Sequence, residues 1–297
     1  MMNLTGKTVL LTGATSGIGF EASVELARRG ATLVMVGRTA AKTASKADEV
    51  RRRSGSSGVE FLVCDFASQK QIRELANAFR SRHDSLHVLV NNAGTVFAKR
   101  TLSEDGIEAT LAVNHLGYFL LTHLLLDLLI KSAPSRIVNV ASTAHYRGTL
   151  DFEDLMLEHG YKIMRAYSRS KLANVLFTRE LARRLAGTGV TVNALHPGAV
   201  ASNIWSGAPR WTHPLLALAK RFMISSAEGA KTILYLATSP DISSQSGLYF
   251  ERNLPRDPSF LAKDERLAKR LWDESTQLVG LAPPARKESV ATSSPSL

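Results

Sequence analysis

Cysteine is almost absent from this sequence, since Cys64 is the single one among 297 residues. One cysteine cannot form a disulfide within the chain, which excludes the disulfide-stabilised scaffolds of small secreted proteins. Histidine, cysteine and acidic residues also fail to cluster at metal-ligand spacing, and His196 has no second ligand near it in the sequence. We therefore predict a protein of a reducing compartment that has no metal site.

Long apolar runs are missing too. The most leucine-rich stretch, residues 118–130, is too short to span a bilayer and contains His123 and Asp127. The first residues lack the charged start, the long apolar stretch and the cleavage site of a secretory signal. We expect a cytoplasmic protein with no transmembrane segment, and peripheral contact with a membrane stays open.

Acidic residues are the minority among the charged ones: 26 stand against 37 lysines and arginines, a net charge of +11. Such an excess is typical of nucleic-acid-binding proteins. The basic residues are spread along the chain, however, without zinc-finger spacing or an aromatic RNA-binding signature. We interpret them as solvated helix faces and predict no nucleic-acid partner.

What the sequence does contain is an alternation of strand-length apolar runs and longer helical patterns. It predicts strands at residues 8–13, 31–37, 59–65, 86–94, 136–142, 190–198 and 246–250. It predicts helices near 18–29, 40–53, 69–81, 105–131, 163–186 and 227–238. This order is typical of an α/β fold, a single-domain Rossmann-type doubly wound parallel sheet with helices on both faces. We expect one domain over residues 1–281 and a disordered tail at 282–297.

The turn after the first strand reads "TGATSGIG" and carries Gly13, Gly17 and Gly19. In a doubly wound sheet this turn binds a dinucleotide, because glycines let the backbone approach a pyrophosphate at a helix N-terminus. The second strand ends in Gly37 and Arg38 rather than in an acidic residue, with Lys42 one turn later. Arginine suits the 2′-phosphate of NADP(H), which an acidic residue would repel. The alternative is a surface arginine that opens a basic helix.

Two more strand ends point to the same ligand. Asp65 ends the third strand and is a candidate adenine contact. The "NNAG" segment, which runs from Asn91 through Ala93 to Gly94, follows the fourth strand, where the backbone passes near the ligand.

Tyr167 and Lys171 lie four residues apart, on one face of a predicted helix. A nearby ammonium would lower the pKa of the tyrosine, which is otherwise too high for efficient proton transfer at neutral pH. Ser142 ends the fifth strand, where its hydroxyl could bond a substrate oxygen. Asn114, inside the long predicted helix, could hold a water that joins the lysine to solvent. Each residue alone could be structural, but their joint placement favours hydride transfer to or from a carbonyl.

Together these segments resemble the short-chain dehydrogenase/reductase family. The matching pieces are "TGATSGIG", "NNAG", Asn114 in "VNHLGYF", Ser142 in "NVAS", "YSRSK" and "HPG", over about residues 5–250. The resemblance implies a catalytic tetrad of Asn114, Ser142, Tyr167 and Lys171. It also implies cofactor contacts from Ser16, Ile18, Pro197 and Gly198, besides Tyr167, Lys171 and the nucleotide residues named above. A homodimer or higher homo-oligomer through the helices near 105–131 and 163–186 is expected on the same ground.

A narrower similarity is to the retinol dehydrogenase-like branch, carried by "VNHLGYFLLTHLLLDLL", "YSRSKLANVLFTRELARRL" and "GTGVTVNALHPG". This branch implies NADP(H), with NAD(H) as the second option, and retinoids, lipid aldehydes or other hydrophobic carbonyls and alcohols as substrates. Many members carry an N-terminal membrane anchor, which this sequence is not expected to have.

The segment at 201–226 is apolar and aromatic, and in the family this region covers the substrate. A structural helix or an interfacial membrane contact are the alternatives. We expect Trp205 and Trp211 to contact the substrate, with His145 and Tyr146 opposite them, although His145 could be a simple loop residue.

The leading hypothesis is an NADP(H)-dependent carbonyl reductase or alcohol dehydrogenase with Tyr167 as general acid or base. The alternative is a nucleotide sensor or scaffold of the same fold without turnover. A serine hydrolase is excluded, because no G-x-S-x-G elbow surrounds Ser142.

Overall fold

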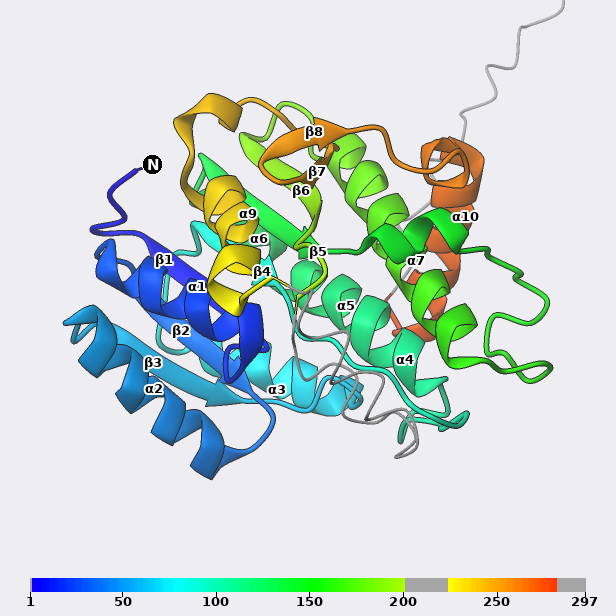
Figure 1. Ribbon diagram of the computed structural model, residues 1–297, viewed down its shortest axis with the longest axis horizontal. Helices are drawn as coiled ribbons and strands as arrows, with labels where there is room; N and C mark the ends of the chain where they lie inside the picture. Colours follow the sequence, from blue (N-terminus) through cyan, green and yellow to red (C-terminus); the bar gives the residue numbers. More distant parts are fainter. Residues whose placement is uncertain (1, 201–223, 282–297) are drawn as a thin grey trace, which may run out of the picture.

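Eight strands form one sheet in the order β3-β2-β1-β4-β5-β6-β7-β8 (Figure 1). Strands β1 to β7 pair in parallel, and β8 closes the edge antiparallel to β7. The order reverses at β1, which has β2 and β4 as its neighbours. In this computed structural model the described residues are 2–200 and 224–281. They confirm the predicted α/β architecture and its doubly wound sheet.

The elements lie close to their predicted positions. The strands are β1 (Thr8–Thr12), β2 (Thr32–Gly37), β3 (Val59–Val63), β4 (Val88–Asn91), β5 (Ser135–Val140), β6 (Val190–His196), β7 (Tyr249–Glu251) and β8 (Leu254–Arg256). The α-helices are α1 (Gly17–Arg28), α2 (Ala40–Ser54), α3 (Gln69–Arg80), α4 (Ala109–Leu111), α5 (Gly117–Leu124), α6 (Leu126–Lys131), α7 (Ile163–Arg184), α9 (Ser226–Thr238) and α10 (Glu265–Leu278). The short helical turns are η1 (Ala112–Leu116), η2 (Thr143–Arg147), η5 (Pro240–Ile242) and η6 (Leu261–Lys263).

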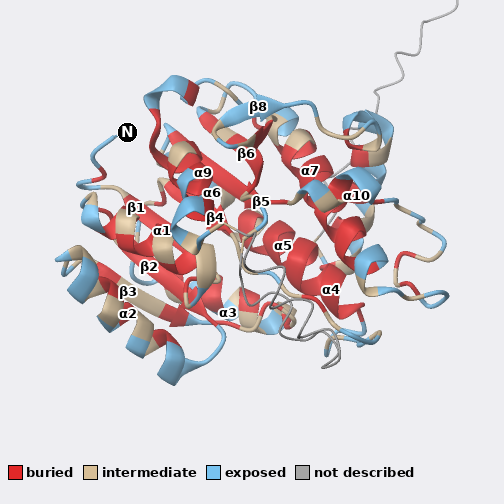
Figure 2. Ribbon diagram, in the orientation of Figure 1, coloured by how far each residue is buried: buried red, intermediate tan, exposed pale blue. Residues whose placement is uncertain are grey.

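Two apolar layers separate the sheet from its helices. On one face, α1, α2 and α9 pack over the strands, and on the other face α3, α5 and α7 do so. Figure 2 shows buried residues along the central strands and along the inner sides of these helices. Because both faces are covered, β1, β4 and β5 are buried along their whole length, as in parallel sheets generally. The carboxyl ends of the strands remain as the edge where a ligand can bind.

The prediction of one continuous helix over 105–131 was wrong. The helix starts only at α4, because the Glu108 carboxylate caps it by accepting from the N–H groups of Thr110 and Leu111. A π-helical turn, η1, follows. Helix α5 then ends at Leu125, whose ψ is 7°. The wider π turn contains Asn114, and such turns often mark functional sites.

Helix α10 was not predicted. Asp264 caps its start, and its apolar residues recur at helical spacing, with Leu271 and Trp272 buried. The Trp272 ring packs against the rings of Phe119 on α5 and Phe177 on α7. Helix α10 therefore covers part of the outer face of both helices. The dimer expected through these helices would have to form beside α10 or displace it.

Several predictions fall outside the described residues. They are the substrate role of Trp205 and Trp211, most of the segment at 201–226, and the tail at 282–297. The end of that segment is described: Ile224 bridges to Val200, and Ser226 already belongs to α9. No helix within the described ranges is long and apolar enough to cross a membrane.

Candidate active site

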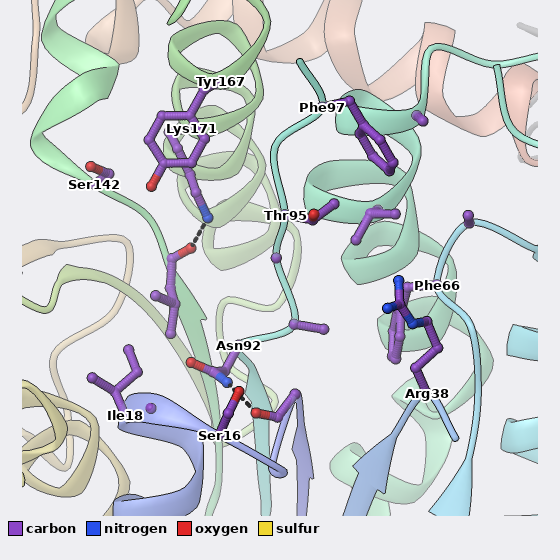
Figure 3. Close-up of a pocket in the computed structure, with 18 of the residues that line it drawn as sticks. Ser16, Ile18, Arg38, Phe66, Asn92, Thr95, Phe97, Ser142, Tyr167 and Lys171 are labelled. Carbon is purple, nitrogen blue, oxygen red and sulfur yellow. Dashed lines mark hydrogen bonds between the residues drawn. The ribbon is translucent and has the colours of Figure 1, made fainter. Parts of the chain in front are cut away.

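A cleft of about 1240 Å³ opens along the carboxyl ends of the strands. The residues of the glycine-rich turn and of the end of β2 line one part of it, the nucleotide end. Ser142, Tyr167 and Lys171 line another part, the catalytic end. Figure 3 shows these three side chains together on one side, with Arg38 and Phe66 on the other.

The glycine-rich turn is held against the segment that follows β4. Gly13 has a φ of +67°, and a Cβ there would lie 2.8 Å from Cα of Ala93. Asn92 Nδ2 donates to the carbonyl oxygens of Thr12, at 2.9 Å, and Gly13, at 3.1 Å. Gly19 does not line the cleft. A Cβ there would come within 2.4 Å of Gly13 O, so this glycine lets α1 pack against the turn.

Helix α1 presents its N-terminus to the cleft. Ser16, Gly17 and Ile18 line the cleft, as the sequence predicts. The Ser16 side chain makes no capping hydrogen bond, and the first turn contains no acidic residue. Neither the cap residue nor an acidic residue of the first turn therefore occupies the positive end of the helix dipole, which fits a pyrophosphate.

Two cations line the cleft at the end of β2. Arg38 and Lys42 are both exposed and make no hydrogen bond or ion pair with any residue in the described part of the chain. Gly37 has no room for a side chain, because a Cβ would lie 2.3 Å from the Thr43 hydroxyl. These cations fit a phosphate on the adenosine ribose, as the sequence predicts.

Of the strand-end residues, Asp65, Ala93 and Gly94 line the cleft. The Asp65 carboxylate already accepts from the backbone N–H of Ala67 at 3.0 Å. Asn91, which the sequence predicts as a cofactor contact, does not line the cleft. Asn91 is fully buried, and its amide donates to Thr122 on α5 and Asn139 on β5. Asn92 lines the cleft instead, since successive side chains of a strand point to opposite faces.

Tyr167 and Lys171 both line the cleft from α7, one turn apart. The tyrosine is 9% exposed and the lysine 2%. Lys171 Nζ donates to the carbonyl oxygen of Val140 at 2.9 Å and lies 5.7 Å from the centroid of the Tyr167 ring. The sheet and the helix thus fix the ammonium beside the phenol, which is the arrangement that the spacing predicts.

The expected lowering of the tyrosine pKa is not found. Burial raises the pKa of Tyr167, and the hydrogen bond with Ser142 opposes this rise only in part. Burial also lowers the pKa of Lys171 to about 7, so its ammonium is only partly populated at neutral pH. The protein alone therefore keeps Tyr167 as a protonated phenol, the form that donates a proton.

Asn114 lies behind the cleft rather than on its surface. Its side-chain oxygen accepts from the Thr95 N–H at 2.8 Å, and its amide donates to Thr95 O and to the Ser170 hydroxyl. Its backbone carbonyl accepts from Asn174 Nδ2 at 2.8 Å. The amide itself thus joins the segment after β4 to α7, and the water that the sequence suggests stays a prediction.

The residues after Ser142 depart from the prediction. His145 and Tyr146 were expected to line the substrate pocket, but neither is among the described residues that line the cleft. His145 is fully buried: Nδ1 lies 2.7 Å from Ser142 O, and Nε2 accepts from the Ser259 N–H. The Tyr146 hydroxyl donates to Asp257 O. His145 therefore fixes the turn that carries Ser142, which is the loop role left open by the sequence.

A buried ion pair braces the catalytic end. Arg169, between Tyr167 and Lys171 in the sequence, is 2% exposed and donates to the fully buried Glu108 at 2.8 Å. It also donates to Leu155 O. Since Glu108 caps α4, the pair joins α7 to the start of the segment that contains Asn114. Sequence inspection missed it, because the two residues are 61 positions apart.

Other lining residues were not predicted either. Three of them, Thr95, Phe97 and Leu102, lie outside helices and strands, where no periodic pattern marks them; Arg147 ends η2 and Met164 lies in the first turn of α7. Pro197 and Gly198, which the resemblance implies, do line the cleft, together with His196. No group of three histidine, cysteine or acidic residues that could hold a metal occurs within the described ranges.

Comparison with known proteins gives consistent matches. A family model described as short chain dehydrogenase matches residues 7–212. Retinol dehydrogenase 13 of Homo sapiens is 43% identical over 291 residues, which covers 96% of this chain and 88% of that protein. An uncharacterised protein from Mycobacterium Paratuberculosis has a TM-score of 0.78 at 34% identity, covering 96% of this chain and 97% of its own. An actinorhodin polyketide ketoreductase variant, solved with NADPH, has a TM-score of 0.67 at 27% identity, covering 82% and 94%.

Proposed function

Because this chain belongs to the short chain dehydrogenase family and is an oxidoreductase, we propose that it transfers hydride between NADP(H) and a hydrophobic carbonyl or alcohol. Tyr167 is the general acid or base in this proposal. The observation that supports this proposal is that Ser142, Tyr167 and Lys171 together line one end of a cleft whose other end suits a dinucleotide. A bound nicotinamide supplies or accepts the hydride.

In the direction of reduction, Tyr167 donates its hydroxyl proton to the carbonyl oxygen as hydride reaches the carbonyl carbon. The raised pKa of the buried phenol favours the protonated form that this step needs. The Ser142 hydroxyl holds the same oxygen in place. The Lys171 ammonium, fixed on Val140 O, stabilises the phenolate that remains. In the direction of oxidation the phenolate takes the proton back.

The preference for NADP(H) over NAD(H) rests on Arg38 and Lys42. Both line the nucleotide end and have no partner among the described residues, so a 2′-phosphate would find two cations there. The absence of an acidic residue at the end of β2 points the same way. A ketoreductase of similar fold was solved with NADPH.

A hydrophobic substrate is supported by apolar side chains that line the cleft. Phe97, Leu102 and Met164 line the cleft, and the last two are 48% and 47% exposed. Apolar side chains this exposed at the edge of a pocket are typical of a binding surface. The matched relative is a retinol dehydrogenase, so a retinoid is one member of the proposed substrate class.

The test is a screen of purified protein with NADPH and with NADH. Straight aldehydes of about four to ten carbons and retinal would be offered, and loss of nicotinamide absorbance followed. We expect kcat/KM to rise with chain length, because each buried methylene contributes about 0.8 kcal/mol. Tight NADPH binding without turnover of any carbonyl or alcohol would favour the sensor alternative, and equal kinetics with both cofactors would reject the NADP(H) preference.

A further inference from the structure

Six charged side chains line the described part of the cleft: Arg38, Lys42, Asp65, Glu104, Arg147 and Lys171. The first three belong to the nucleotide end. Glu104 accepts a hydrogen bond from the Ser68 hydroxyl at the start of α3. Lys171 is buried on Val140 O. Arg147 therefore stands out as an exposed cation that comes from the catalytic end.

The chain places Arg147 one short helical turn after Ser142. It is the last residue of η2, the turn that begins directly after Ser142. The next residue, Gly148, touches α7 so closely that a Cβ would lie 2.5 Å from Ser168 O. Ser168 directly follows Tyr167, so the backbone beside Arg147 is pressed against the helix turn that carries the catalytic tyrosine.

The Arg147 guanidinium has no partner in residues 2–200 or 224–281, since it makes no hydrogen bond and no ion pair there. Two other arginines differ in this respect. Arg100 bonds to Met156 O and faces Glu158, and Arg165 bonds to His159 O and Gly160 O. A guanidinium presents five N–H donors in a planar fork that matches a carboxylate or a phosphate.

The acidic lining residues, Asp65 and Glu104, come from the segments after β3 and before α4, not from the turn after Ser142. The turn η2 itself contains no acidic residue, so an anion bound by Arg147 would not be repelled by a carboxylate of this turn. The apolar residues Phe97, Leu102 and Met164 line the same cleft. The cleft thus combines a proton-transfer group, an apolar surface and a cation that has no partner among the described residues.

From this combination we infer that the substrate is amphipathic: a carbonyl or alcohol at one end, an apolar middle and an anionic group bound by Arg147. Carboxylate and phosphate share the required chemistry. Five residues of a 3₁₀ turn span about 10 Å, so Arg147 lies well beyond Ser142. An anion there would be separated from the carbonyl by an apolar chain, for which about eight carbons, roughly the length of this turn, is the trial length. This inference rests on the proposed function and specifies its substrate class.

The experiment compares octanal with 8-oxooctanoate and with the corresponding ω-phosphate aldehyde, using NADPH and the full chain. We expect wild-type kcat/KM to be at least about tenfold higher for one of the anionic substrates, since a charge-assisted hydrogen bond has about this effect. The preferred substrate then shows whether Arg147 binds a carboxylate or a phosphate. Arg147→Gln should lower that value about tenfold to a hundredfold and leave octanal unchanged. Added salt should weaken the preference.

Arg165→Gln is the matched control, because Arg165 is exposed, bonds only to backbone oxygens and does not line the cleft. Arg165→Gln should leave kcat/KM unchanged both for the preferred anionic substrate and for octanal. Wild-type kinetics that are equal for charged and neutral aldehydes, or that favour octanal, would overturn the inference while leaving the proposed reductase intact. The same loss in both arginine variants would also overturn it. A wild type that turns over none of the three aldehydes, with retinal equally inert, would instead count against the proposed function.

Discussion

The nucleotide end of the cleft is built mainly from backbone and small side chains, whereas the catalytic end is built from buried, chargeable side chains. At the first end, Gly13, Gly19 and Gly37 lie where the chain is packed too closely for a Cβ. At the second, Tyr167 and Lys171 are withdrawn from water and their pKa values shift in opposite directions. The first end recognises a ligand by shape and surface charge. The second keeps reactive groups in an environment that changes their protonation.

The two ends of the cleft also differ in how their cations affect the stability of the fold. An exposed cation such as Arg38 or Lys42 is solvated and has little effect on folding. A buried ammonium such as Lys171, with one hydrogen bond to a carbonyl, destabilises the folded state and is retained because the site needs it. Variants at the two ends should therefore fail in different ways, and four predictions test this contrast.

Tyr167→Phe should give the largest effect. Phenylalanine keeps most of the packing but has no proton to transfer, so kcat should fall by about two to four orders of magnitude. The Kd for NADPH, measured by fluorescence titration, should change little, because the nucleotide end is untouched. Turnover near that of the wild type on every active substrate would remove Tyr167 from the proposed mechanism.

Arg169→Met should cause the largest loss of stability. It leaves the fully buried Glu108 without its cation, and breaking such a pair destabilises proteins by about 3–5 kcal/mol. Denaturant unfolding measures the loss. The double variant with Glu108→Gln should recover part of it, since no charge is then left unpaired. A single variant as stable as the wild type would show that the pair does not brace the catalytic end.

Most of the nucleotide end was predictable from sequence, because its signals are local. A glycine-rich turn after a strand, and a basic residue in place of an acidic one, are each contained in a few consecutive residues. Asn91 shows the limit: the sequence marks the strand end correctly, but one residue decides whether a side chain faces the cleft or the core. Asn92 faces the cleft and Asn91 the core.

The catalytic end was predictable only in part. Tyr167 and Lys171 follow from helical spacing, and Ser142 from the end of a strand. The Glu108–Arg169 pair and the Asn114 contacts with Thr95 and Ser170 depend on tertiary packing, which no local pattern encodes. The lining role expected of His145 failed for the same reason: its ring bonds turn η2 to the segment that follows β8.

Arg38→Asp should reverse the nucleotide preference and spare the catalytic end. The loss of a charge-assisted hydrogen bond, together with the new repulsion, should raise the KM for NADPH about tenfold to a hundredfold. The KM for NADH should fall, and kcat with the preferred cofactor should stay within a few-fold of the wild type. Gly37→Asp is not an equivalent variant, because its Cβ would meet the Thr43 hydroxyl at 2.3 Å and should destabilise β2. If Arg38→Asp left the ratio of kcat/KM for NADPH to kcat/KM for NADH unchanged, the proposed contact of Arg38 with the 2′-phosphate would be rejected.

Lys171→Met should change the free energy of unfolding less than Arg169→Met does, and with the opposite sign. Burial lowers the folded pKa of Lys171 to about 7, whereas an unfolded lysine titrates near 10.4. Below pH 7 both states hold the proton, and the folded state carries the full penalty of a buried ammonium. Between the two pKa values the unfolded state binds more protons, so the stability that the wild type gains from this group rises with pH.

Methionine at position 171 removes the penalty of the buried ammonium. We expect it to raise the free energy of unfolding at pH 6 by about 1–2 kcal/mol, after the lost hydrogen bond to Val140 O is allowed for. The gain should shrink as the pH approaches 9, in denaturant unfolding followed across that range. Lys42→Met, the exposed control at the nucleotide end, should show no such pH dependence. A Lys171→Met variant that is less stable than the wild type at pH 6 would mean that the buried ammonium stabilises the fold, and the contrast between the two ends would then rest on their chemistry alone.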